Sequence, residues 1–151
     1  KKWLLERLEA STATFKVIAS GTLWTESADK GGKDSWWGVK GEREEIFSLI
    51  DRRRIGGVLL ISADRHRTDI YRIERPDGYP LYEFETSKLT NRHTHGVKSA
   101  ALFSYNKGNF FGSLSFVLTG GDPAVTFQCV TIDGESVHRR TLRRSELERR
   151  P

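Results

Sequence analysis

Two side chains able to bind a metal ion follow an apolar run near the middle of the chain. Residues 58–61 read Val-Leu-Leu-Ile, with Gly56 and Gly57 in front and polar residues behind. A short unbroken run of this kind is typical of a central strand covered on both faces. Asp64 and His66 stand two residues apart just after it. Because α/β sheets bind ligands at the carboxyl ends of such strands, the pair predicts a metal site, with a surface turn and a salt-bridged aspartate as the alternative.

A second possible ligand pair is the His-Thr-His sequence that contains His93 and His95. In an extended segment both imidazoles would point to the same side and could bind a metal ion together. Histidines in a polar loop are also common without a ligand, so both interpretations stay open.

Two arginines next to the Asp-x-His motif could bind a substrate phosphate. Arg65 and Arg67 carry planar guanidinium groups, which form paired hydrogen bonds with phosphate oxygens. The alternative is a solvent-facing arginine paired with Asp69 or Glu74.

A long irregular stretch, residues 22–41, is rich in tryptophan and glycine. Loops of this length in compact domains are commonly lids or binding loops. Trp36 and Trp37 could form a wall of the substrate cleft and stack on an organic leaving group, or they could pack the loop onto the core. Asp34 could orient a neighbouring ligand or cap a turn. We assign no catalytic residue from the sequence.

Composition favours one compact domain, since the chain has 151 residues and 36% of them are hydrophobic. It contains no apolar run long enough to span a bilayer. Its single cysteine, Cys129, excludes an intrachain disulfide and a cysteine zinc cluster. The net charge is +5, but arginines 52–54 suit a helix end and the basic tail is interleaved with glutamates. Nucleic acid is therefore not indicated as a partner.

The first half of the chain predicts helices and parallel strands. Apolar spacing predicts helices over residues 2–10 and from Glu42 onward, with Gly56 placed to end the second helix. Strands are expected at 14–19 and 58–61. Residues 14–62 then form a strand–helix–strand unit, which is expected to be parallel and right-handed.

Beyond Thr68 the pattern becomes rich in β-strands. Alternating residues predict strands at 79–85, 113–118 and 125–129, and Asp133-Gly134 predicts a hairpin turn into a strand at 136–142. The expected fold class is therefore α/β, with an antiparallel β-rich part at the C-terminal side.

An ordered set of segments resembles the C-terminal half of PhoD-like phosphatases (alkaline phosphatase D), of the calcineurin-like metallophosphoesterase superfamily. The matching segments are Trp3, Leu4 and Leu8, residues 15–21, 34–38, Glu42 and Arg43, residues 57–66, 79–83 and 87–90. The resemblance implies the second half of a layered α-β-β-α fold, with residues 1–151 as one partial domain. The N-terminal half of that domain would lie outside this sequence.

The resemblance also implies metal-dependent hydrolysis of phosphomonoesters or phosphodiesters by the intact parent, whereas this chain alone is expected to be inactive. Asp64 and His66 match the two ligands of the family's Ser-Gly-Asp-x-His motif. The metals implied are iron and calcium, with manganese or zinc as further possibilities. The remaining ligands would come from the missing half, and the family's members are often extracytoplasmic.

This sequence departs from the family motif at Ala63, where the family has glycine. If that glycine has a positive φ, alanine would strain the turn by about 1 kcal/mol.

The competing hypothesis for function is a non-catalytic basic module, rich in β-strands, that binds an anionic polymer or a protein.

Overall fold

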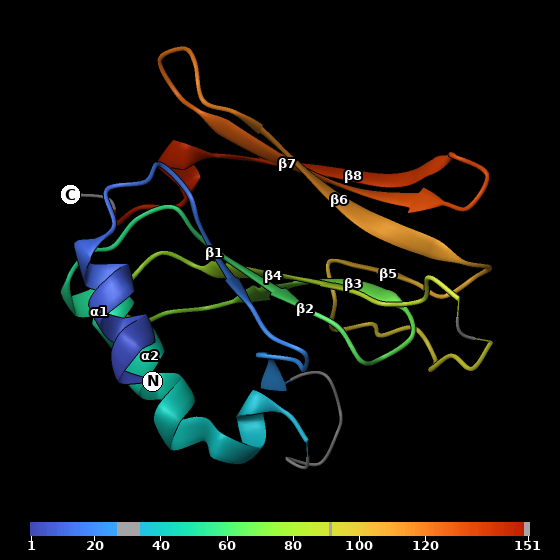
Figure 1. The fold of residues 1–151 in the computed structure, drawn as a ribbon, viewed down its shortest axis with the longest axis horizontal. Helices are drawn as coiled ribbons and strands as arrows, with labels where there is room; N and C mark the ends of the chain where they lie inside the picture. Colours follow the sequence, from blue (N-terminus) through green and yellow to red (C-terminus); the bar gives the residue numbers. More distant parts are fainter. Residues whose placement is uncertain (27–33, 91, 150–151) are drawn as a thin grey trace.

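Two β-sheets lie face to face in this protein, and helices α1 (Lys2–Ala10) and α2 (Lys40–Arg52) lie on the other side of the larger sheet (Figure 1). The computed structural model describes residues 1–26, 34–90 and 92–149. The sheets meet through the stacked rings of Phe84 and Phe127, whose centroids are 4.8 Å apart. This arrangement supplies three of the four layers expected for an α-β-β-α fold.

The larger sheet is mixed, with the strand order β1-β2-β4-β3-β5. Its strands are β1 (Lys16–Ala19), β2 (Val58–Ser62), β3 (Thr68–Ile73), β4 (Leu81–Thr86) and β5 (Phe103–Tyr105). β1 and β2 pair in parallel, which confirms the predicted parallel unit. The predicted antiparallel pairing of the second half holds between β4 and β3, but β4 also pairs in parallel with β2, which was not expected. Strands β3 and β5 were not predicted, and both pair antiparallel within this sheet.

The smaller sheet is antiparallel and confirms the predicted β-rich C-terminal part. It contains β6 (Phe110–Val117), β7 (Ala124–Thr131) and β8 (Ser136–Arg143) in that order. The predicted hairpin joins β7 to β8, and Gly134 has the positive φ of 84° that favours glycine in such a turn. Cys129 is fully buried between its strand neighbours, as expected for a small core residue.

The helices bury one apolar stripe each. Helix α2 follows a short 3-10 helix, η2 (Trp36–Val39), and packs Ile46, Phe47 and Ile50 into the core. It ends at Arg52, and the left-handed residue after it is Arg54, with φ of 51°. The prediction that Gly56 ends this helix is therefore wrong. Within the described part of the chain, no helix is long and apolar enough to cross a membrane.

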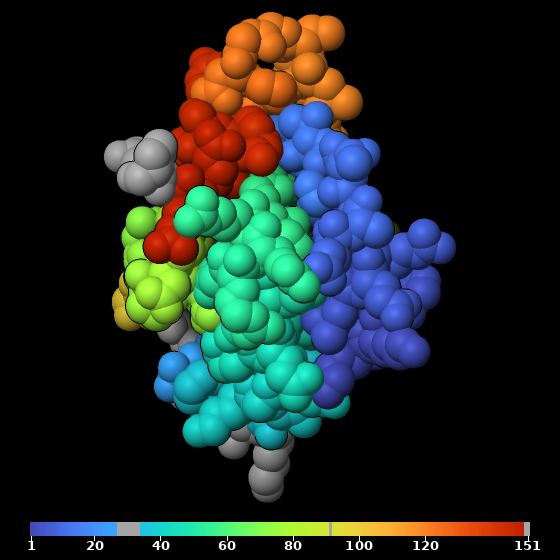
Figure 2. Space-filling view, turned by 90° about the vertical axis from the view of Figure 1, so that its left-hand side faces the viewer, coloured from blue at the N-terminus to red at the C-terminus, as the bar shows by residue number. Residues whose placement is uncertain are grey.

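The start of β2 is clamped by the C-terminal segment, which includes the short helix η3 (Arg144–Glu146). Gly57 has φ of 75°, and a Cβ atom there would lie 2.1 Å from the carbonyl oxygen of Thr14. The Gly57 amide donates to the carbonyl of Leu147 at 2.7 Å. The Arg144 Nε atom donates to the Thr14 carbonyl at 3.1 Å. Figure 2 shows the red C-terminal residues packed against the green and blue segments at this place.

Candidate metal centre

Asp64 and His66 lie in a sharp turn directly after β2, at the edge where the parallel strands β1, β2 and β4 end. Their φ angles are 88° and 50°, which are uncommon for residues with a side chain. Strained backbone of this kind often occurs at functional sites. Ala63 is not among the described residues with positive φ. The strain expected at Ala63 is therefore absent, and the turn is made by the two predicted ligands themselves.

Three imidazoles meet beside this turn. One potential ligand atom from each of His66, His93 and His95 lies within 4.8 Å of the other two. The ring centroids of His93 and His95 are 4.8 Å apart, and they lie 5.5 Å and 6.0 Å from the centroid of His66. The two predicted ligand pairs thus come together through His66, although Asp64 is not a member of this group.

Backbone hydrogen bonds hold the histidine loop against the turn. The Thr94 hydroxyl, between the two loop histidines, donates to the carbonyl of His66 at 2.6 Å. The His66 amide donates to the Ser87 hydroxyl at 3.0 Å, and Ser87 donates to Glu85 at 2.7 Å. Because both backbone groups of His66 are bonded to neighbouring segments, the backbone position of His66 is set by the fold.

The electrostatic surroundings favour the neutral form of His95. Partial burial lowers the pKa of His95, and the positive charge of Arg65 adds to this effect. Neutral imidazole is the form that can bind a metal ion, and the lowered pKa keeps this form present at lower pH. A set of three imidazole nitrogens fits a borderline transition metal such as zinc or iron.

Two buried carboxylates lie on the strand beside the turn, and sequence reasoning missed both. Glu83 and Glu85 lie on one face of β4 and are fully buried. Burial raises the pKa of Glu83 to about 7, although it accepts backbone bonds from Trp24 and Thr25 and a bond from Ser62. Burial raises the pKa of Glu85 to about 8. Their alternation with aromatic residues is typical of a half-exposed strand, so the sequence holds no signal for their burial.

The arginines of the motif behave differently from each other. Arg67 is fully buried, and its Nε atom donates to Asp69 at 2.6 Å. The predicted partner Asp69 is correct, but the solvent-facing position is wrong, because the guanidinium group also contacts the hydroxyl of Tyr71 inside the sheet. The Arg67 side chain is thus held inside the sheet by Asp69 and Tyr71, and its role in binding phosphate stays a prediction. Arg65 is half-buried, and its positive charge contributes to the lowered pKa of His95. Its role in binding phosphate stays a prediction.

Trp36 and Trp37 lie in the part of the long loop that leads into helix α2. Trp36 stacks on Trp24 with a centroid distance of 4.4 Å and donates to the hydroxyl of Ser20, which fits the core-packing alternative. Trp37 is half-buried next to the cationic groups of Lys40 and Arg43. Residues 27–33 of the loop lie outside the described residues.

Asp34 takes part in a turn, as one of its two interpretations expected. Its φ is 56°, and its carbonyl oxygen accepts a hydrogen bond from the Thr22 hydroxyl at 2.5 Å. This bond joins the two described ends of the long loop.

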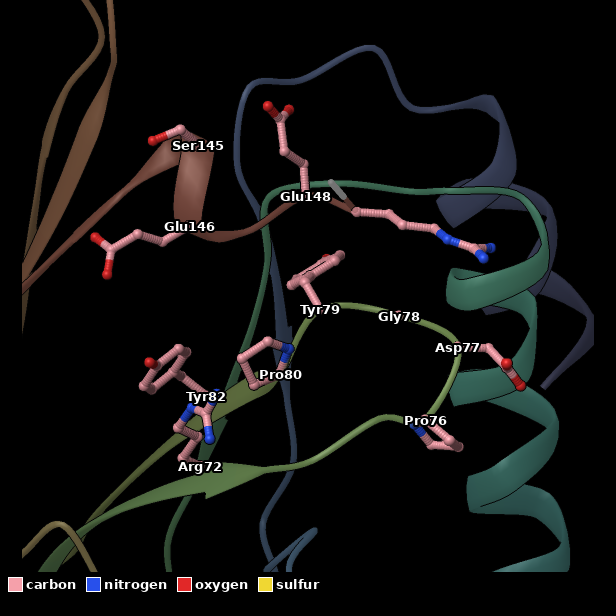
Figure 3. A pocket seen from close by; sticks show the side chains of 11 residues that line it. Arg72, Pro76, Asp77, Gly78, Tyr79, Pro80, Tyr82, Ser145, Glu146 and Glu148 are labelled. Carbon is pink, nitrogen blue, oxygen red and sulfur yellow. The ribbon is translucent and has the colours of Figure 1, made fainter. Parts of the chain in front are cut away.

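A pocket of about 510 Å³ lies at the opposite end of β4 from the histidines (Figure 3). Its lining comes from the segment before β4, with Tyr79 and Pro80, and from the C-terminal segment, with Glu146 and Glu148. A smaller pocket of about 310 Å³ opens between the two sheets beside Ala63 and is mostly apolar. The smaller one adjoins the carboxyl ends of the parallel strands, where ligands of α/β sheets are expected.

Potential metal ligands at the carboxyl ends of parallel strands are typical of α/β proteins, which bind their ligands at this edge of the sheet. The chain belongs to the PhoD-like phosphatase family, whose family model matches residues 1–116. None of the curated proteins matches the chain.

The fold is similar to a solved structure described as the structure of PhoD. The TM-score is 0.62 at 16% sequence identity, and the match covers 91% of this chain. This chain spans only 34% of the length of that PhoD chain. The likeness supports the resemblance in fold that the sequence predicted.

Proposed function

We propose that this chain is part of a metal-dependent phosphatase that hydrolyses phosphoesters, and that Asp64 and His66 are two of its metal ligands. The proposal is carried by the position of Asp64 and His66 in a chain that belongs to the PhoD-like phosphatase family. Both residues follow the central parallel strand in a turn with two positive φ angles. A metal ion bound there would polarise phosphoryl oxygens and lower the pKa of a bound water.

The residues of this chain have separate parts in the proposed site. Asp64 supplies a carboxylate oxygen and His66 an imidazole nitrogen, so the pair suits iron, manganese or zinc, and the carboxylate also suits calcium. Arg65 is the residue best placed to bind a phosphate oxyanion, because Arg67 is engaged with Asp69 inside the sheet. The apolar pocket beside Ala63 would exclude water from the reacting groups.

The test is hydrolysis of a phosphomonoester and a phosphodiester by the full-length parent. We expect activity to be lost on chelation and to return with added iron, calcium, manganese or zinc. Asp64→Ala should lower kcat/KM by at least roughly a hundredfold, because it removes a metal ligand. The matched control is Asp77→Ala, which removes an exposed carboxylate at the opposite end of β4. Unchanged activity in the Asp64 variant would show that the ligand assignment is wrong.

The same experiment separates the competing hypothesis of a non-catalytic basic module. That hypothesis predicts salt-sensitive binding of a polyanion by the parent without turnover under any metal condition. Turnover that depends on metal and on Asp64 would exclude it.

A further inference from the structure

Three of the four histidines in this sequence gather at one point of the fold. His66 comes from the turn after β2, while His93 and His95 come from the loop between β4 and β5. The fourth, His138, lies on β8 and stacks on Phe103 at 3.9 Å, outside the group. The convergence joins segments that are about thirty residues apart, so it arises from tertiary structure.

The distances suit one shared metal ion. A zinc ion bound by nitrogens at 2.0–2.1 Å in tetrahedral geometry places those nitrogens about 3.4 Å apart. The corresponding atoms of the three histidines lie within 4.8 Å of one another. Rotation of the side chains would bring them to the bonding distance, and the exposed position of His93 allows it.

Hydrogen bonds hold the loop that carries His93 and His95 in position without a metal ion. Thr94 stands between the two loop histidines and donates to the backbone of His66. The Asn106 side chain donates to the carbonyl of His95 at 3.1 Å, which ties the same loop to the segment after β5. A site held by its backbone in this way loses less conformational entropy when the metal binds.

We propose that His66, His93 and His95 together bind one divalent transition-metal ion of the zinc class. Three imidazoles with an exposed side leave a fourth position for water or a phosphate oxygen. Imidazole binds zinc, iron(II), nickel(II) and copper(II), whereas calcium prefers oxygen ligands. The site shares His66 with the proposed phosphatase site and deepens that proposal, because His93 and His95 become further ligands of the ion that His66 binds. Its ligands and its metal selectivity can be measured whether or not the parent hydrolyses a phosphoester.

Zinc content of the full-length parent tests the proposal. After equilibrium dialysis against Zn²⁺, the unchanged protein should hold one more equivalent of zinc than His93→Gln/His95→Gln. The single variant His93→Gln should weaken zinc affinity at this site by at least roughly tenfold. His138→Gln is the matched control and should keep the full zinc content. Calcium content, measured with Ca²⁺ in place of Zn²⁺, should be equal in all four proteins.

Equal zinc content in the unchanged protein and the double variant would overturn the proposal, as would an equal loss in His138→Gln. Imidazole nitrogen NMR of the unchanged protein gives a second measurement if a variant fails to fold. Zinc should shift the ring signals of His66, His93 and His95 and leave those of His138 in place. Signals of the three that do not move on zinc addition would also overturn it.

Discussion

Glu85 should make this protein less stable as the pH rises. The carboxyl group is buried on β4, and Asp69 stands opposite it in the strand register. Burial raises its pKa to about 8, and the negative charge of Asp69 adds to this. The Ser87 hydroxyl and the charge of Arg67 lower it by less. In the unfolded chain, the same group has an ordinary pKa near 4.5.

The folded state therefore holds a proton that the unfolded state has lost at intermediate pH. Between about pH 4.5 and pH 8, the free energy of unfolding falls as the pH rises, and outside this window the residue adds no slope. At 1.36 kcal/mol for each pH unit, the full effect is at most about 5 kcal/mol. That is comparable to the whole stability of many domains, so it should be readily measured.

The substitution Glu85→Gln removes the ionisation and keeps the shape of the side chain. Its amide oxygen can still accept from Ser87, which now donates to the carboxylate at 2.7 Å. We expect the variant to match the unchanged protein near pH 5 and to be more stable near pH 9, by up to about 5 kcal/mol. Urea unfolding followed by tryptophan fluorescence at five pH values measures this, because Trp24 is buried in the core.

The matched control is Glu135→Gln, since Glu135 is exposed beside the hairpin turn. It should leave the pH dependence unchanged. Glu83, with a pKa of about 7, contributes its own fall in both proteins, so the difference between the curves isolates Glu85. Curves for the unchanged protein and Glu85→Gln that stay parallel from pH 5 to pH 9 would refute the reasoning.

Three further substitutions should separate local strain from packing, with urea unfolding as the measurement. Gly57→Ala should cost about 2 kcal/mol or more, because φ is 75° and the new Cβ would meet the Thr14 carbonyl; a loss below 0.5 kcal/mol would contradict the clamp. Phe127→Ala should cost about 3–5 kcal/mol, since its fully buried ring stacks on Phe84, and a loss near zero would contradict the packing between the sheets. Ala63→Gly should not raise phosphatase activity in the parent, since Ala63 has no positive φ, and a tenfold gain would restore the idea of strain there.

Apolar patterns in the sequence correctly predicted the strands whose apolar side chains are buried. The run at 58–61 became β2, and the alternating segment from Val125 became β7. Strand β3 was missed because it carries Asp69 and Arg72 among its apolar residues. The buried Asp69 is stabilised by hydrogen bonds from Arg67, Tyr71 and Ser104. Ser104 lies on the neighbouring strand β5, which is distant in the sequence. Partners of that kind are a property of the fold, which no local pattern expresses.

The candidate site was predictable in its parts but not in its assembly. The Asp-x-His pair and the His-Thr-His sequence were both recognised as possible ligands from their spacing. Their meeting at His66 depends on the Thr94 hydroxyl and on the path of the loop after β4. Glu83 and Glu85 were missed because alternating charges in a strand normally face water. The parallel pairing of β4 with β2 then places Glu83 and Glu85 opposite Leu60 and Ser62, at the end of β2 that leads into the turn.

The clamp at Gly57 also has a consequence for the order of folding events. It joins Thr14 to Arg144, two residues that are 130 positions apart in the chain. Contacts between such distant residues slow folding, because a long loop must close before they form. During synthesis, the amino end of β2 can be secured only after residues 144–147 have left the ribosome. Until β7 and this segment are made, the face of the larger sheet that Phe127 covers stays exposed to water, so the protein depends on these later residues to protect its core from aggregation.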